Sequence, residues 1–266
     1  MRKMYKTMTA VLSGDAQIGF MGSEASIYVY NEGAEDYVVN FAQLTQRAGN
    51  FLVSRDTNED FKWENIKGKT IIGGRAGGMP QMVLEYILKK NKIDIKKDLT
   101  IIQNIDFGVT GEAFTSGTGD YTVEFEPTAT AIEKSGKGKV VASLGVESGM
   151  VPYTSYAAKK SYIEKNGDII QSFTNAIQKG IDYVNNHSPE EIAKVIAPQF
   201  PEMDEKDLVT TVTRYYDQQT WKENVIFEEE SLTLLLNIVE EAGVISERPP
   251  YQDIITTEYA EKAYKK

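Results

Sequence analysis

Short apolar runs, each followed by a turn and a helically patterned segment, recur along the first half of the chain. The runs expected to form strands cover residues 17–21, 70–72, 99–102, 121–125 and 140–143. Helices are expected after the first four runs, over residues 24–31, from Met79 onward, over 111–115 and over 128–134. Strands that alternate with helices predict an α/β fold with parallel sheets flanked by helices. In such sheets, ligands bind beyond the carboxyl ends of the strands.

Two strand-rich stretches interrupt this alternation, at residues 37–54 and 153–157. We interpret them as paired crossings between two domains. They predict a discontinuous first domain formed by residues 1–54 and 151–266, and an inserted second domain formed by residues 55–150.

The rest of the chain has a helical pattern. One apolar stripe comprises Ile169, Ile170, Phe173, Ile177, Ile181 and Val184, and another comprises Leu232, Leu235, Leu236 and Val239. Such stripes predict core-facing sides of helices. Capping boxes are expected at Ser161–Glu164 and Ser188–Glu191. Near the start, Met4, Met8, Val11 and Leu12 predict an amphipathic helix that ends at Ser13-Gly14.

A glycine-rich turn stands between the apolar run 70–72 and the helix that begins near Met79. Gly73, Gly74, Gly77 and Gly78 fit neither a dinucleotide fingerprint nor a phosphate loop, because the required spacing and the Gly-Lys-Ser/Thr ending are missing. A strand that turns through glycines into a helix directs backbone N–H groups at whatever lies above, which favours an electron-rich group. The alternative is that the glycines only permit a tight turn and close packing.

Composition excludes several classes of function. The 266 residues carry a formal net charge of −10, which argues against nucleic acid and against anionic membrane surfaces. The chain has no cysteine and one histidine, so thiol nucleophiles, disulfides and cysteine-bound metals are excluded. That histidine, His187, lies in Asn185–Pro189 and is expected to be a surface residue at a helix C-terminus. No apolar run has the length of a membrane span.

Four segments resemble one family of binding proteins. They are Leu12–Phe20, Trp63–Ile71 leading into the glycine turn, Phe125–Pro127 and Ala157–Asn166. The first is similar to the leucine, x-Gly-x-x-Asp-Ile-Gly segment of the nitrate/sulfonate/taurine group of periplasmic-type solute-binding proteins, with Gln17 where aspartate is usual. That group includes binding proteins for the pyrimidine precursor of thiamine. The resemblance covers essentially the whole chain in the right order.

The resemblance implies a type II two-lobed binding fold with mixed sheets flanked by helices and a helical C-terminal tail. It implies an extracytoplasmic solute-binding component of an ABC importer, a monomer without a cofactor that closes its two lobes on a solute and delivers it to permease subunits. Family members have a signal peptide and a first strand–helix–strand unit that this sequence does not contain. We expect a truncated form, with any lipid anchor upstream, rather than a protein that lacks the unit.

Candidate ligand-binding residues follow from the strand-end turns and the crossings. Those of the first lobe are Gly22, Ser23, Glu24 and Gln43, and Tyr153 lies near the second crossing. Those of the inserted lobe are Arg75, Gly77, Gly78, Met79, Phe107, Glu124 and Glu126. Capping of the following helix is the alternative role for Ser23 and Glu24. Glu124 and Glu126 face opposite ways if the segment is extended, so at most one of them is expected to reach the ligand.

These residues favour no single ligand class. Two carboxylates at the site suit a heterocycle with N–H donors or a cationic solute, whereas the glycine turn suits an anion such as a sulfonate. A planar nitrogen heterocycle satisfies both. The alternatives to a binding protein are an enzyme on the same fold, resembling menaquinone-pathway or pyrimidine-synthesising proteins, and a sensor module detached from a receptor. The pyrimidine-synthesising type depends on a cysteine-rich motif that this chain does not have.

Overall fold

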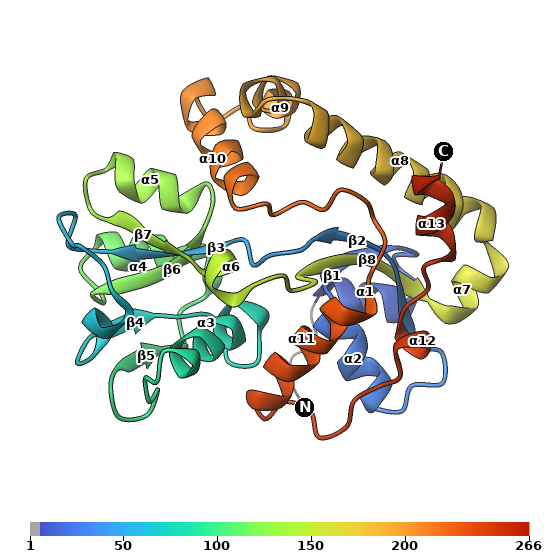
Figure 1. The fold of residues 1–266 in the computed structure, drawn as a ribbon, viewed down its shortest axis with the longest axis horizontal. Coiled ribbons are helices and arrows are strands. Elements are labelled where there is room, and N and C mark those ends of the chain that lie inside the picture. The colour runs from blue at the N-terminus through green and yellow to red at the C-terminus, as the bar shows by residue number, and fades with distance from the viewer. Residues whose placement is uncertain (1–5, 266) are drawn as a thin grey trace. The chain divides into compact units, whose positions relative to one another are not determined.

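The computed structural model describes residues 6–265, which form two compact units (Figure 1). Unit 1 takes in the described chain up to Gln46, then Met150–His187, and the chain from Trp221 onward. Unit 2 consists of Arg47–Gly149 and Ser188–Thr220. Unit 1 thus consists of three segments of the chain and unit 2 of two, whereas the sequence analysis expected a single inserted segment, residues 55–150. Residues 47–54 and 188–220 are grouped with unit 2, whereas the sequence analysis placed them in the first domain.

A five-stranded mixed sheet forms the centre of unit 2, in the order β5-β4-β6-β3-β7. The strands are β3 (Asn50–Ser54), β4 (Thr70–Ile72), β5 (Thr100–Ile102), β6 (Tyr121–Phe125) and β7 (Lys139–Ser143). Strand β4 is parallel to β5 and β6, while β3 is antiparallel to both β6 and β7. The carboxyl ends of β4, β5, β6 and β7 therefore meet at one edge of the sheet, where β3 begins. Strands β4 to β7 each lie within two residues of their predicted positions, and β3 lies in the strand-rich stretch 37–54.

Helices cover both faces of this sheet. They are α3 (Met79–Lys90), α4 (Thr110–Thr115), α5 (Thr128–Lys134) and α6 (Leu144–Ser148), with short 3-10 turns η1 (Trp63–Ile66) and η2 (Phe107–Val109). Phe51 and Val53 of β3 pack with Phe114 of α4 and Ile132 of α5 in one buried cluster. The alternation of side chains along β3 places Leu52 on the opposite face of the sheet.

Two later helices belong to unit 2 because they are tied to α5. They are α9 (Pro189–Ile196) and α10 (Glu205–Asp217), joined through the 3-10 turn η3 (Ala197–Gln199). Arg214 of α10 forms ion pairs with Glu126 and Glu133, and Lys134 pairs with Asp204 at 2.7 Å. The predicted capping box at the start of α9 is confirmed, with Ser188 and Glu191 bonded reciprocally.

Unit 1 is built on a three-stranded sheet in the order β1-β8-β2. The strands are β1 (Gly19–Gly22), β2 (Val38–Thr45) and β8 (Thr154–Lys159). Strand β8 pairs antiparallel with both of its neighbours. The expectation of a parallel sheet is therefore wrong for the described part of unit 1, because β8, which returns from unit 2, separates β1 from β2.

The helices of unit 1 enclose this sheet (Figure 1). They are α1 (Lys6–Ser13), α2 (Glu24–Asn31), α7 (Lys160–Lys165), α8 (Gly167–Asn186), α11 (Glu229–Glu241), α12 (Tyr251–Ile254) and α13 (Glu258–Tyr264). Met8 and Val11 of α1 pack with Val29 and Val38 in one cluster, whereas Phe41, Ile170 and Ile181 belong to another. Met4, which was expected on the first helix, lies outside the described residues.

Two local predictions in unit 1 are wrong. Ile169 was expected in the core but is 52% exposed. Successive residues of a helix are rotated by about 100°, so Ile169 points away from the buried face that holds Ile170 and Ile181. Ser161 does not cap a helix: α7 begins at Lys160, and the Ser161 hydroxyl donates to Asp36 at 2.7 Å.

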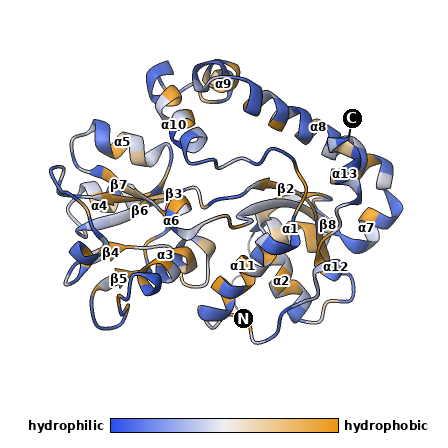
Figure 2. Ribbon diagram, viewed as in Figure 1, coloured by the Kyte–Doolittle hydropathy of each residue, from blue (hydrophilic) through white to orange (hydrophobic). Residues whose placement is uncertain are grey.

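Hydrophilic and hydrophobic colours alternate along α8 and α9 in Figure 2, whereas hydrophobic residues gather on the strands and on the helix faces beside them. Within residues 6–265, we find no helix that combines the length and the hydropathy required to cross a bilayer.

Candidate functional site

The carboxyl edge of the sheet in unit 2 gathers most of the predicted residues of that unit. The glycine turn follows β4, Phe107 follows β5, Glu126 follows β6, and Asn50 opens β3 opposite Phe125. Strand ends of this kind place loops and helix N-termini around a common point. This edge is the candidate ligand surface of unit 2.

The glycine turn has two structural roles that the sequence could not separate. A side chain at Gly73 would lie 2.4 Å from Gln81 Oε1, and one at Gly74 would lie 2.9 Å from the Gln81 backbone nitrogen. These two glycines permit the close packing of α3 on the turn. Gly77 has φ +74°, a left-handed conformation that favours glycine, and the space beside it is open.

Most backbone donors at the start of α3 are used within the turn, since the Gln81 and Met82 N–H groups donate to the Gly78 carbonyl. Gly78 is the N-cap residue, and its own N–H donates to the Arg75 carbonyl at 3.0 Å. No side chain caps the helix, and Pro80 has no N–H to satisfy. The buried Met79 begins the helix, and Arg75 is exposed on the turn before it. A helix start without a side-chain cap suits an electron-rich ligand group.

Phe107 gives this edge an exposed aromatic surface. Its side chain is 51% exposed. Its ring meets Phe125 edge to face, with 5.2 Å between the ring centroids. The contact fixes the orientation of the Phe107 ring while leaving part of it open to solvent, which suits stacking against a planar solute.

Glu124 is buried in unit 2 and bonded to hydroxyls. Its Oε1 accepts from Thr122 at 2.6 Å and its Oε2 accepts from Thr110 at 3.1 Å. Burial raises the pKa of Glu124, and the two hydroxyl donors partly oppose that shift.

Glu126 faces a cation. Its Oε1 accepts from Arg214 Nη1 at 2.5 Å, and its Oε2 accepts from the Thr130 backbone N–H at 3.0 Å. Both oxygens are therefore used between β6, α5 and α10. The two glutamates have separate surroundings, as the alternation along β6 predicts.

In unit 1, the predicted residues lie where β1 ends. Ser23 is buried, and its hydroxyl donates to Ser155 Oγ at 3.0 Å instead of capping α2. Glu24 is buried in the first turn of α2, and a side chain at Gly22 would lie 2.2 Å from Glu24 Oε2. The carboxylate therefore packs against the Gly22 backbone, which leaves room for no side chain there.

A buried network of hydroxyls and amides continues from Ser23 across the sheet. Ser155 Oγ donates to Asn40 Oδ1 at 2.6 Å, and Asn40 Nδ2 donates to Ser26 Oγ at 2.7 Å. Sequence reasoning missed Asn40 and Ser155, because isolated polar residues inside apolar strands carry no motif. Their position within otherwise buried strands is the signal that was available.

The other two predicted residues of unit 1 are also buried beside this network. Gln43 Nε2 donates to the Thr45 carbonyl at 3.0 Å, and Gln43 Oε1 has no hydrogen-bond partner among residues 6–265. The Tyr153 carbonyl accepts from the Ser23 N–H at 3.3 Å. Gly22, Ser23, Glu24, Gln43 and Tyr153 thus lie at one end of the sheet of unit 1.

Two further residues at the carboxyl edge of unit 2 were missed. Arg47, which is partly buried, donates from Nη1 to the Gly145 carbonyl at 3.1 Å. Its Nε is buried without a partner within the described chain, as are both amide atoms of Asn50. A single arginine or asparagine in a crossing gives no periodic signal, so only its place next to the start of β3 could have suggested it.

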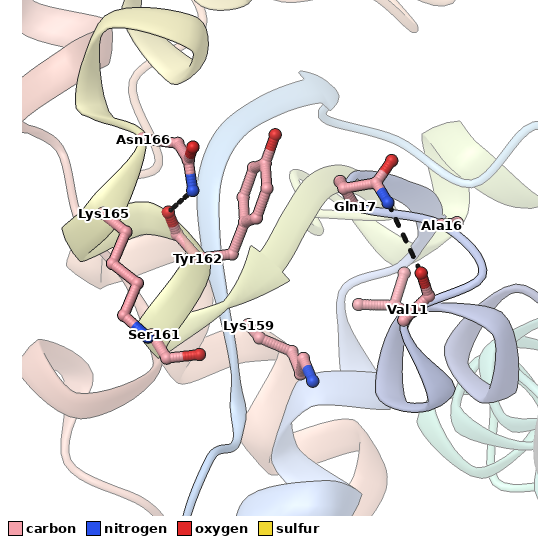
Figure 3. A pocket seen from close by; sticks show the side chains of 9 residues that line it. Val11, Ala16, Gln17, Lys159, Ser161, Tyr162, Lys165 and Asn166 are labelled. Carbon is pink, nitrogen blue, oxygen red and sulfur yellow. Dashed lines mark hydrogen bonds between the residues drawn. The ribbon is translucent and has the colours of Figure 1, made fainter.

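A surface pocket of about 320 Å³ opens elsewhere in unit 1, and Figure 3 shows the residues that line it. They come from the end of α1, the turn before β1, the end of β8 and α7: Val11, Gly14, Ala16, Gln17, Lys159, Ser161, Tyr162, Lys165 and Asn166. Gln17 donates to the Gly14 carbonyl and Asn166 to the Tyr162 carbonyl. None of the predicted ligand residues lines this pocket, which adjoins the end of β8 opposite Thr154.

Within residues 6–265, no group of three or more histidine, aspartate or glutamate side chains is placed to hold a metal ion. His187 Nδ1 lies 2.7 Å from the Tyr183 carbonyl, and its ring stacks on Tyr183 at the end of α8. This placement confirms the expected position at a helix C-terminus.

Comparison with known proteins agrees with this architecture. The periplasmic aliphatic sulphonate binding protein SsuA from Escherichia coli superposes with a TM-score of 0.73 at 17% identity, over 97% of this chain and 84% of that chain. The alkanesulfonate-binding protein SsuA from Xanthomonas axonopodis pv. citri, solved with MOPS bound, gives a TM-score of 0.73 at 13% identity, over 94% of this chain and 83% of that chain. The fold is therefore that of the type II periplasmic binding proteins, as predicted.

Sequence similarity identifies the family. The chain matches the family described as NMT1/THI5 like over residues 3–192. YtlA of Bacillus subtilis, described as a candidate binding protein, is 48% identical over 257 residues, which are 97% of this chain and 77% of that protein. The chain belongs to the NMT1/THI5-like family, and the resemblance stated from the sequence is confirmed.

Proposed function

We propose that this protein is the extracytoplasmic solute-binding component of an ABC importer. It binds a small organic solute and delivers it to permease subunits, and it does so without chemical change to the solute. The observation that carries the proposal is the 48% identity to a candidate binding protein over nearly the whole chain.

Each unit, taken by itself, presents residues suited to a solute. Unit 2 supplies the start of α3 and the exposed Phe107 ring at the carboxyl edge of its sheet. Unit 1 supplies the buried polar residues around Gly22 and Gln43. Aromatic surface and a few placed polar groups are both typical of sites for small molecules. A planar nitrogen heterocycle or a sulfonate fits this combination.

Native mass spectrometry of protein purified from its source without refolding tests the proposal. We expect a stoichiometric small-molecule adduct that is lost on denaturation, and the extracted solute should be recovered unaltered after incubation with fresh protein. Recovery of a chemically changed product would instead indicate an enzyme. A protein that shows no adduct and binds no member of a panel of heterocycles, sulfonates and carboxylates in calorimetry would contradict the proposal.

A further inference from the structure

We infer that Arg47, assisted by Asn50, anchors an anionic head group of the solute, a carboxylate or a sulfonate. The inference rests on the proposed function and specifies the solute class for the ligand surface of unit 2. Both residues lie at the carboxyl edge of the sheet, where β3 begins, and neither belongs to the set that the sequence analysis predicted.

Arg47 is a partly buried cation without a counter-charge. Within residues 6–265, no carboxylate forms an ion pair with its guanidinium group, and its Nη1 donates to the Gly145 carbonyl. Its Nε–H is buried and unused. Partial burial of a charge is unfavourable unless an opposite charge or hydrogen bonds compensate for it. The unused donors of a guanidinium fork match the paired oxygens of a carboxylate or sulfonate.

Three other arginines of the described chain, Arg55, Arg214 and Arg248, differ from Arg47 in this respect. Arg214 and Arg248 pair with glutamates. Arg55 also has no recorded carboxylate partner in the described chain, but its donors are used by the carbonyls of Phe114, Thr118 and Gly119, and it lies over the Phe114 ring. Arg55 thus donates to three carbonyls at and after the end of α4, whereas Arg47 donates to one carbonyl.

Asn50 adds a second unused donor three residues further along the chain. It is fully buried, and of the buried carboxamides that the structure describes, it alone has both amide atoms unpartnered. An unsatisfied buried polar group costs about 1–3 kcal/mol, so such a group calls for a partner. Its Nδ2 is suited to donate to the same anion as Arg47.

The segment that carries both residues is held in place. A side chain at Gly145 would lie 2.2 Å from the Ala48 carbonyl oxygen, so α6 packs directly on this backbone. Gln218 Nε2 donates to the same carbonyl at 3.2 Å. A side chain at Gly49 would contact the ring of Phe125 at 3.2 Å. The Arg47–Asn50 backbone is therefore preorganised, which reduces the entropy lost when a solute binds.

The surroundings favour an anion as well. The carboxylates of Glu124 and Glu126 are both occupied by donors of unit 2, so they do not neutralise Arg47. The start of α3 at the same edge has no side-chain cap, and the positive end of its helix dipole favours negative charge. The exposed Phe107 ring suits an apolar or planar body attached to the anionic group.

The test uses solute pairs that differ in charge but hardly in shape. Benzoate is compared with benzamide and benzenesulfonate with benzenesulfonamide by isothermal titration calorimetry, together with the solute that native mass spectrometry recovers. We expect the wild-type protein to prefer the anion of each pair it binds. Arg47→Ala should weaken binding of the anion roughly 10- to 150-fold, the loss expected for a charged hydrogen bond. The affinity of Arg47→Lys for the anion should lie between those of the wild type and Arg47→Ala.

Control variants separate the anchor from general effects. Arg248→Ala removes the same charge from an exposed ion pair and should leave the affinity unchanged. Asn50→Ala should weaken binding of the anion about 3- to 30-fold. Circular dichroism and thermal unfolding should show a folded chain in every variant.

The possible outcomes are distinct. A bound anion whose affinity is unaffected by Arg47→Ala overturns the inference and leaves the proposed function intact. The same holds if the recovered solute is neutral or cationic. A wild-type protein that binds no solute of any class overturns the proposed function, and the inference with it.

Discussion

At the residue scale, a side chain at Gly22 is expected to be unfavourable, because it would displace the buried Glu24 carboxylate that packs against it. In Gly22→Ala the new methyl group would displace a buried carboxylate, and overpacking of this kind costs about 1–3 kcal/mol. We expect a loss of unfolding free energy in that range, measured by urea denaturation. Weaker solute binding should accompany it if Glu24 belongs to the site.

Gly180 provides the matched control. It lies inside α8, where an added Cβ would meet nothing within 4 Å. Gly180→Ala should therefore stabilise the chain by about 0.5–1 kcal/mol, because alanine favours the helix more than glycine does. Equal effects of the two substitutions would contradict the packing argument for Gly22.

Glu124 predicts a pH dependence of stability. Burial raises the pKa of its carboxyl above the ordinary value of 4.5 in the folded state, so below pH 4.5 the group is protonated in both states. As the pH rises toward the raised pKa, the unfolded chain loses its proton first, and folding stability falls. Glu124→Gln removes this ionisation. The unfolding free energy of the variant should therefore increase relative to that of the wild type as the pH rises from 4 to 7.

Urea denaturation at several pH values between 4 and 8 measures the difference. Glu112→Gln, on the exposed side of α4, controls for the added amide. A difference between Glu124→Gln and wild type that stays constant with pH would show that the Glu124 carboxyl titrates alike in both states.

Of the candidate site residues, the sequence could locate only those that belong to a pattern. The glycine turn could be located because a β-branched run precedes it and helical periodicity follows it. Arg47 and Asn50 could not be located in this way. They stand out because some of their buried polar atoms have no hydrogen-bond partner within residues 6–265, and a sequence pattern does not show that. Asn40 and Ser155 are similar, since the bond between them joins residues 115 positions apart.

At the element scale, Arg214 is expected to hold α10 on unit 2. Its guanidinium group pairs with Glu126, whose side chain is fully buried, and with Glu133 on α5. Arg214→Met would leave Glu126 without its counter-charge. Because 21% of the Arg214 side chain is exposed, we expect a loss of roughly 2–4 kcal/mol, somewhat less than for a fully buried pair.

Urea denaturation of Arg214→Met measures this loss, and Arg248→Ala should cost less than about 1 kcal/mol because its pair is exposed. Hydrogen exchange should show faster exchange in α9 and α10 of Arg214→Met. Unchanged protection there would mean that apolar packing, not the ion pairs, attaches these helices.

Element positions were predicted more accurately than the assignment of elements to units. The expected helices at 24–31 and 128–134 coincide with α2 and α5, because apolar periodicity is a local property. Membership of α9 and α10 in unit 2 depends on Arg214 and Lys134, which are contacts made across some 70 to 90 residues of sequence. Periodicity holds no information about such contacts, nor about the antiparallel pairing of β8.

At the scale of the whole molecule, solute binding and folding stability are linked. A solute that binds the folded chain and not the unfolded chain stabilises it by about 2.7 kcal/mol at a concentration 100 times the dissociation constant. For a chain of this size, 1 kcal/mol corresponds to about 2–4 °C in the unfolding midpoint. We therefore expect the recovered solute to raise the midpoint by roughly 5–10 °C under these conditions.

Differential scanning calorimetry with increasing solute checks this expectation, and the charge of the solute makes the test specific. An anion held by Arg47 should raise the unfolding midpoint of the wild-type protein and of Arg248→Ala equally. Because Arg47→Ala binds the anion more weakly, it should need a roughly 10- to 150-fold higher anion concentration for the same rise in midpoint. A midpoint that rises equally in all three proteins would place the anion elsewhere on the molecule. The dependence of the unfolding midpoint on solute concentration therefore reports how Arg47 contributes to binding. A solute that binds only the folded chain raises the unfolding free energy of the whole chain by an amount set by its affinity.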